Sequence, residues 1–222
     1  MITIRFAKRK SLTFKSLMAM FVVMFFLLAN GGALQAQDYD YHLGVRGGVG
    51  MSTLTGFQNN GLKLGLTAGG YAKLVFDEHS SVDVELSYST GGQQSQKWLE
   101  NGSEQLKLYS KYNLHYLNLP ILYQYYFTDI LGLEGGFNFR YCMAGSLKTK
   151  IGNESWHSVD FGNDSFNSFD FGAVLGVYTE NLIPHDNFFV SLRSYFGFLD
   201  VVKNVGSNKN ISVQVSVGYM FK

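Results

Sequence analysis

The sequence predicts an all-β fold: an eight-stranded, antiparallel, up-and-down transmembrane β-barrel that follows a cleaved signal peptide. Three observations predict it. The N-terminus reads as an export signal, apolar residues alternate with small or polar ones along later segments, and the connections between those segments are short and long in turn. Glycine and aromatic residues are abundant and only 2 prolines occur, which suits strands better than helices.

The first 36 residues have the order of a secretory signal peptide. Basic residues come first, an apolar run of about 13 residues extends from Leu17 to Ala29, and small residues lead to Ala36. A helix needs about 20 apolar residues to cross a bilayer, so this run is too short for a permanent anchor. We therefore expect cleavage after Ala36, which leaves one mature domain over residues 37–222.

Period-two alternation is purest between Asn210 and Lys222, where every second residue is apolar. Side chains on a strand point to opposite faces in turn, so such a segment has one apolar face and one polar face. The same pattern predicts seven more strands, at Tyr41–Leu54, Leu62–Phe76, Val82–Tyr88, Leu106–Phe127, Leu131–Tyr141, Ser168–Glu180 and Asn187–Leu199. Pro120 cannot donate to a ladder, so we expect a bulge or bend there.

The connections fit a barrel whose N-terminus is periplasmic, because such barrels alternate short inner turns with longer outer loops. We predict outer loops near 55–61, 92–105, 146–167 and 200–209, and inner turns near 77–79, 128–129 and 181–186. Aromatic residues gather at the inner strand ends, as expected for a girdle at a membrane boundary. They are Tyr39, Tyr41, Phe76, Tyr125, Tyr126, Phe127, Phe188, Phe189, Tyr219 and Phe221.

The polar face carries charges of both signs in mid-strand, which distinguishes a membrane barrel from a soluble one. A soluble sandwich would also alternate, with its polar face in water. Here the charges stand among glycine and serine, and this combination can fill a narrow eight-strand lumen. They are Arg46, Lys73, Asp83, Glu85, Glu134, Arg140, Asp170 and Arg193.

Six of these charges form a predicted lumen network: Arg46, Asp83, Glu85, Glu134, Arg140 and Arg193. We expect Glu85 and Glu134 to pair with the three arginines, because unpaired charges in a tight interior are costly. The network could be a gate in a narrow channel or a structural filling of ion pairs. The second is favoured, since side chains usually fill barrels of eight strands.

Four segments carry a resemblance to a known family: Val82–Ser89, Tyr116–Tyr123, Phe169–Gly176 and Val217–Phe221. The Tyr-Leu-x-x-Pro segment is the most specific of them. Through these segments the chain resembles the PorT-type outer-membrane barrel family of Gram-negative bacteria. Asn118 and Leu119 stand where the family often has a glutamate before an Ile-Pro pair, so no role of that carboxylate carries over. The resemblance implies residence in the outer membrane and, through the founding member, a link to protein secretion.

The residues that could carry chemistry give weak signals. Cys142 is the single cysteine, the histidines lack metal-ligand spacing, and no cofactor or metal site is predicted. The glycines from Gly44 to Gly50 lack the lysine and helix of a phosphate loop and more plausibly permit close packing. His79 with Ser81 leaves a lipid-acting enzyme as a minor alternative. No basic stripe follows the signal peptide, so nucleic acid is not an expected partner.

The outer loops are the preferred place for function. Trp98, Trp156 and Phe161 stand among polar residues there, and exposed aromatics in such surroundings mark binding surfaces, although these could instead fold over the barrel mouth. We therefore predict a non-enzymatic outer-membrane protein with a structural or interaction role, in secretion or adhesion. Its expected partners are outer-membrane lipid and a protein bound through the loops. A narrow channel is the alternative.

Overall fold

The computed structural model describes residues 40–56, 60–101, 104–152, 155–161, 166–180, 187–203 and 207–221. The predicted signal peptide lies outside these residues. The described strands are β1 (Asp40–Leu54), β2 (Asn60–Gly61), β3 (Lys63–Asp77), β4 (Ser80–Asn101), β5 (Glu104–Tyr126), β6 (Leu131–Ile151), β7 (His157–Phe161), β8 (Phe169–Glu180), β9 (Phe188–Asp200) and β10 (Lys209–Phe221). Within the described ranges, no helix has the length and hydropathy to span a membrane.

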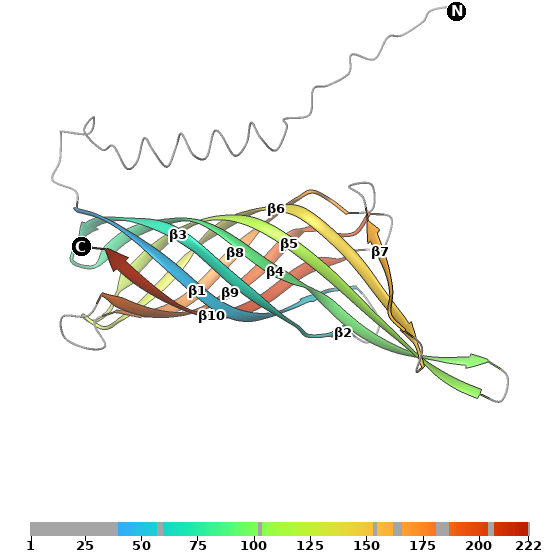
Figure 1. Cartoon of the computed structure of the whole chain (residues 1–222). Coiled ribbons are helices and arrows are strands. Elements are labelled where there is room, and N and C mark those ends of the chain that lie inside the picture. The colour runs from blue at the N-terminus through green and yellow to red at the C-terminus, as the bar shows by residue number, and fades with distance from the viewer. Residues whose placement is uncertain are drawn as a thin grey trace, which may run out of the picture. The chain divides into compact units, whose positions relative to one another are not determined.

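Eight long strands form a closed ring. Neighbours follow the order β4, β3, β1, β10, β9, β8, β6, β5, and the additional pairing of β4 with β5 closes the sheet (Figure 1). Every pairing is antiparallel. The short strands β2 and β7 are added at the sides of β4 and β6. The predicted eight-stranded up-and-down barrel is thus confirmed, and closure leaves no open edge in its wall.

The wall has a polar inside and an apolar outside. All eight charged residues predicted on the minority face are buried, each at 6% exposure or less: Arg46, Lys73, Asp83, Glu85, Glu134, Arg140, Asp170 and Arg193. Apolar side chains that alternate with them are exposed, for example Val49, Leu66, Leu175 and Val215. An exposed belt of this kind is stable only against lipid, because in water it would be an unusually large apolar surface.

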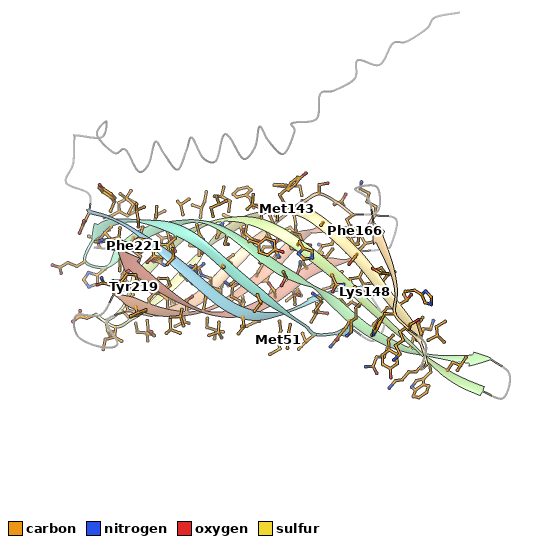
Figure 2. The ribbon with its side chains drawn as sticks, in the orientation of Figure 1. Met51, Met143, Lys148, Phe166, Tyr219 and Phe221 are labelled. Carbon is orange, nitrogen blue, oxygen red and sulfur yellow. The ribbon has the colours of Figure 1, made fainter. Side chains whose placement is uncertain are left out.

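Aromatic residues surround the periplasmic end, where Figure 2 labels Tyr219 and Phe221. Seven residues of the predicted girdle are exposed there: Tyr41, Phe76, Tyr125, Phe127, Phe188, Tyr219 and Phe221. Two predictions were wrong, because Phe189 is buried in the lumen and Tyr126 donates to Glu180 inside it. Tyr39 lies outside the described residues.

Glycines make room for the rings that point inward. A Cβ atom on Gly132 would lie 2.6 Å from the ring of Tyr178, and one on Gly44 or Gly218 would collide with Tyr71 or Phe189. The glycines therefore let large rings lie flat against the neighbouring strand.

The predicted outer loops at 92–105 and 146–167 are largely strand, which corrects the sequence prediction. β4 and β5 remain paired in one register from Ser80 with Tyr125 to Asn101 with Glu104. β6 continues to Ile151 along β5, and β7 pairs with its end. Figure 1 shows the β4–β5 hairpin extending well beyond the barrel, with β6 and β7 beside its base. We name this four-stranded part, residues 92–113 and 145–161, the projecting sheet.

The irregularity expected at Pro120 lies elsewhere. The β4–β5 ladder omits pairs between Val84 with Ile121 and Ser87 with Asn118, as expected where proline lacks an N–H, but the register does not shift. The shift occurs between β5 and β6, where His115 pairs with Ala144 and Tyr116 with Cys142. Met143 is the extra residue of this bulge.

Candidate functional site

The middle of the lumen is filled by a cluster around Arg193. Its guanidinium donates from NH1 to Glu85 Oε2 at 2.7 Å, from Nε and NH2 to the two oxygens of Glu134, and its NH2 lies 3.3 Å from Asp83 Oδ2. Arg46 NH1 donates to the same Glu85 oxygen at 2.9 Å. Strands β1, β4, β6 and β9 each supply at least one of these side chains, so the cluster connects opposite sides of the wall.

Neutral groups complete the cluster. Arg46 NH2 donates to Ser216 Oγ at 2.7 Å and also to Ser191, and Gln124 Nε2 donates to Glu134 Oε2 at 3.0 Å. Two guanidiniums thus face three carboxyls in a space that admits little water. Such an arrangement is tolerated only while each charge keeps its partners.

Arg140 departs from the predicted network. It does not pair with Glu85 or Glu134; its Nε donates to Asn118 Oδ1 at 3.0 Å, and its NH1 lies 3.9 Å from Asp170 Oδ2. Its guanidinium lies between two rings, 4.1 Å from the centroid of Tyr116 and 4.5 Å from that of Tyr195. Arg140 therefore belongs to a separate layer, nearer the outer mouth. A cavity of about 60 Å³, enough for a few water molecules, is lined by both layers.

A third charged group lies toward the periplasmic end. Lys73 forms an ion pair with Glu180 and donates to the Tyr126 hydroxyl at 2.8 Å. Its ammonium also lies over the rings of Tyr126 and Tyr178. Lys73 was predicted to face inward but not to join the six-residue network; its partners Glu180 and Tyr126 come from β8 and β5, which are distant in the sequence.

The outer mouth of the lumen is filled by apolar side chains. Leu54, Leu114, Tyr116, Cys142, Phe166, Val201 and Val202 form one buried cluster. Phe166 and Val202 come from the connections and pair with each other by a β-bridge. Asn208 fixes this turn, because its side-chain oxygen accepts the N–H groups of Val201 and Val202. Part of the outer connections thus folds into the mouth; Figure 2 labels Phe166 at this end.

The loop residues predicted to bind a partner lie on the projecting sheet. Trp98 on β4 is 60% exposed and Trp156, just before β7, is 42% exposed. Phe161 ends β7 and its backbone pairs with Gly145, while its side chain is outside the described set. The two tryptophans therefore remain available at the surface, in contrast to Phe166.

The geometry does not assemble an active site from His79 and Ser81. His79 lies in the β3–β4 turn with its ring beside outward-facing Tyr125. Ser81 is fully buried in the lumen, where its hydroxyl donates to Gln124. The two side chains thus lie on opposite sides of the wall, too far apart for a base to activate the hydroxyl. Among the residues described, no group of histidine, cysteine, aspartate or glutamate could hold a metal ion.

Comparison with known families identifies the barrel. Residues 35–203 match the family described as outer membrane protein beta-barrel domain. The chain belongs to this family. It is therefore an integral β-barrel protein of the Gram-negative outer membrane, and its lipid-facing belt lies in that membrane. No curated protein matches the sequence.

Several solved outer-membrane barrels are similar in fold. Ail, the attachment invasion locus protein of Yersinia pestis, solved with the heparin analogue sucrose octasulfate, is 14% identical, with 82% of this chain and 99% of that chain covered and a TM-score of 0.44. Neisserial surface protein A is 13% identical, with coverage of 83% and 100% and a TM-score of 0.44. OprG of Pseudomonas aeruginosa is 16% identical, with coverage of 81% and 95% and a TM-score of 0.37.

Proposed function

We propose that this family member is a non-enzymatic anchor that holds the projecting sheet outside the cell for contact with a partner, as an accessory of secretion or adhesion. The observation that carries the proposal is the unbroken register of β4 with β5, which continues from the periplasmic end of the barrel to the tip of the hairpin. A paired ladder transmits the rigidity of the closed barrel to the sheet. A contact surface on it is thus already ordered before a partner binds, which lowers the entropic cost of binding.

The division between lumen and sheet supports the same function. The lumen groups are engaged with one another, and the mouth is filled. By contrast, Trp98 and Trp156 are large, exposed and set among polar residues, as in contact surfaces of other proteins. We therefore assign the interaction role to the projecting sheet. We assign a structural role to the cluster of Arg46, Asp83, Glu85, Glu134 and Arg193 and to the separate layer around Arg140.

Export and the link to PorT-type barrels belong to this proposal. Residues 1–36 would act as a signal peptide, and the Tyr-Leu-x-x-Pro segment around Pro120 supports a relation to the PorT type. Mass spectrometry of the protein extracted from outer membranes tests the first point, because cleavage after Ala36 leaves Gln37 as the first residue.

Site-specific photo-crosslinking in intact cells tests the function. A photoreactive residue replaces Trp98 or Trp156, and exposed Ser207, on the same side of the membrane but outside the projecting sheet, is the matched control. We expect a discrete adduct from positions 98 and 156 that position 207 does not give. Adducts of the same size from all three positions, or from none, would refute a contact role for the sheet.

A further inference from the structure

The outer face of the projecting sheet, the face that continues the lipid-facing side of the barrel, carries four lysines. In β5, residues 117, 119, 121, 123 and 125 face lipid, and the same alternation brings Lys107 and Lys111 to that side. Lys111 pairs with Lys148 across the β5–β6 ladder, and Tyr109 pairs with Lys150. Since paired residues share a face, Lys148 and Lys150 join them; Figure 2 labels Lys148 near the base of the sheet.

The bulge at Met143 creates this arrangement. In the barrel, β6 turns its odd-numbered residues to the lipid, among them Leu133, Phe137 and Phe139. An extra residue reverses the alternation, so that beyond Met143 the even-numbered residues face outward. Without the bulge, Lys148 and Lys150 would lie on the other side of the sheet from Lys111.

Two of the four lysines lie against aromatic rings. The Lys107 ammonium is 5.1 Å from the centroid of Trp98 and 5.4 Å from that of Tyr109, and the Lys111 ammonium is 4.8 Å from that of Trp156. Among the side chains that the structure describes, which do not include those of Glu100, Glu104 and Asp160, no ion pair joins any of the four lysines to a carboxylate. Lys111 and Lys148 are directly opposed like charges, which is unfavourable without an anion between them.

The position of these lysines relative to the apolar belt indicates which anion they meet. The exposed apolar residues just before β3 reach Leu62, which is 56% exposed. Its neighbour Gly61 pairs with Gln94 of β4, and Gln94 pairs with Lys111 of β5. Lys111 therefore lies at the outer edge of the apolar belt. This is the depth of the headgroups, where lysine and aromatic side chains commonly lie together.

We propose that Lys107, Lys111, Lys148 and Lys150, with Trp98, Tyr109 and Trp156, bind the phosphate groups of the glycolipid in the outer leaflet of the surrounding membrane. This proposal rests on the proposed function, because it takes the projecting sheet as a contact surface. It names the chemistry of one contact on that surface. Phosphate would occupy the space between the opposed ammonium groups of Lys111 and Lys148, and the ring of Trp156 beside Lys111 would lie at the headgroup level. Such contacts would fix the angle at which the sheet leaves the membrane.

Intrinsic fluorescence can test this, because the chain has 2 tryptophans and both lie beside these lysines. The folded protein is placed in phosphatidylcholine nanodiscs with increasing amounts of diphosphorylated lipid A, or of lipid A whose phosphates have been removed. We expect the phosphorylated form alone to shift the emission to shorter wavelength. An equal response to both forms would overturn the proposal.

Substitutions of Lys111 and Lys148 test whether these lysines bind the phosphate. Lys111→Gln with Lys148→Gln should raise the lipid A fraction at half-maximal shift by about thirtyfold, given the usual contribution of each lysine at an anionic surface. Lys111→Arg with Lys148→Arg should retain binding. The control, Lys97→Gln, removes an exposed charge from the opposite face of the projecting sheet and should change the midpoint less than twofold. A loss with Lys97→Gln as large as that with the double glutamine variant would overturn the assignment.

Dextran sulfate, added to the protein in pure phosphatidylcholine nanodiscs, tests whether the lysines bind a soluble polyanion instead of a lipid phosphate. A shift with dextran sulfate but none with lipid A would refute the membrane ligand. If photo-crosslinking at 98 and 156 still captures a protein, the interaction function would survive that result. If lipid A binds and no crosslink forms in cells, the function fails and the lipid contact stands.

Discussion

At the scale of single residues, the burial of charge was predictable and its pairing only partly so. Alternation identifies which face a residue occupies, and all eight inward charges follow from it. The partners of Arg140 could not be predicted in this way, because they depend on the register between strands: Asp170 stands directly opposite it on β8, and Tyr116 lies on the other neighbour, β5. Arg193 has the most ion pairs in the described lumen, with Asp83, Glu85 and Glu134.

Replacing Arg193 with methionine should therefore destabilise the barrel strongly. Three carboxyls would then share Arg46 alone, and breaking a buried ion pair from one side costs about 3–5 kcal/mol. Adding Glu134→Gln should recover part of that loss, because it removes one of the uncompensated charges. Urea unfolding in lipid vesicles, monitored through the gel mobility of the folded barrel, measures the free energy of unfolding of both variants. A double variant as unstable as the sum of its single changes would contradict charge compensation.

At the scale of elements, alternation predicted the strands inside the membrane and missed their continuations. The pattern arises because one face meets lipid and the other the lumen. From Gln94 to Trp98 both faces of β4 are open to water, so the sequence between Gln93 and Gln105 loses its period and reads as a loop. The pairing persists there because the hairpin register was already set within the barrel.

Shortening the hairpin should accordingly leave the barrel intact. Joining Gln96 to Tyr109, which pair directly, through an Asn-Gly turn removes the tip without changing the register below it. We expect the free energy of unfolding to change by no more than about 1 kcal/mol, since no lumen group is lost. The same gel assay after urea measures this. The disruptive control is a deletion inside the barrel that removes the paired residues Gly70 and Leu86. A shortened chain that fails to fold would show that the sheet is needed for assembly.

At the scale of the whole molecule, the lumen is closed by layers that differ in chemistry. Lys73 with Glu180 lies toward the periplasm, the Arg193 cluster occupies the middle, and Arg140 between its two rings lies farther out. The apolar cluster with Phe166 fills the mouth. An ion would have to displace every layer in turn, and the energetic cost of separating the buried pairs adds to that of opening the mouth.

We therefore expect no stepwise ion conductance when the protein is inserted into planar bilayers. Glu134→Gln and Arg140→Met should remain silent as well, because each leaves the other layers in place. Opening the mouth alone, with Phe166→Ala and Val202→Ala, should also give no current, since the charged layers below it still fill the lumen. A large porin inserted in the same bilayers confirms that insertion is detectable. The opposite result would be discrete openings of the unaltered protein whose size or frequency changes with Glu134→Gln or Arg140→Met. That result would establish a gated channel and overturn the structural role of the lumen charges.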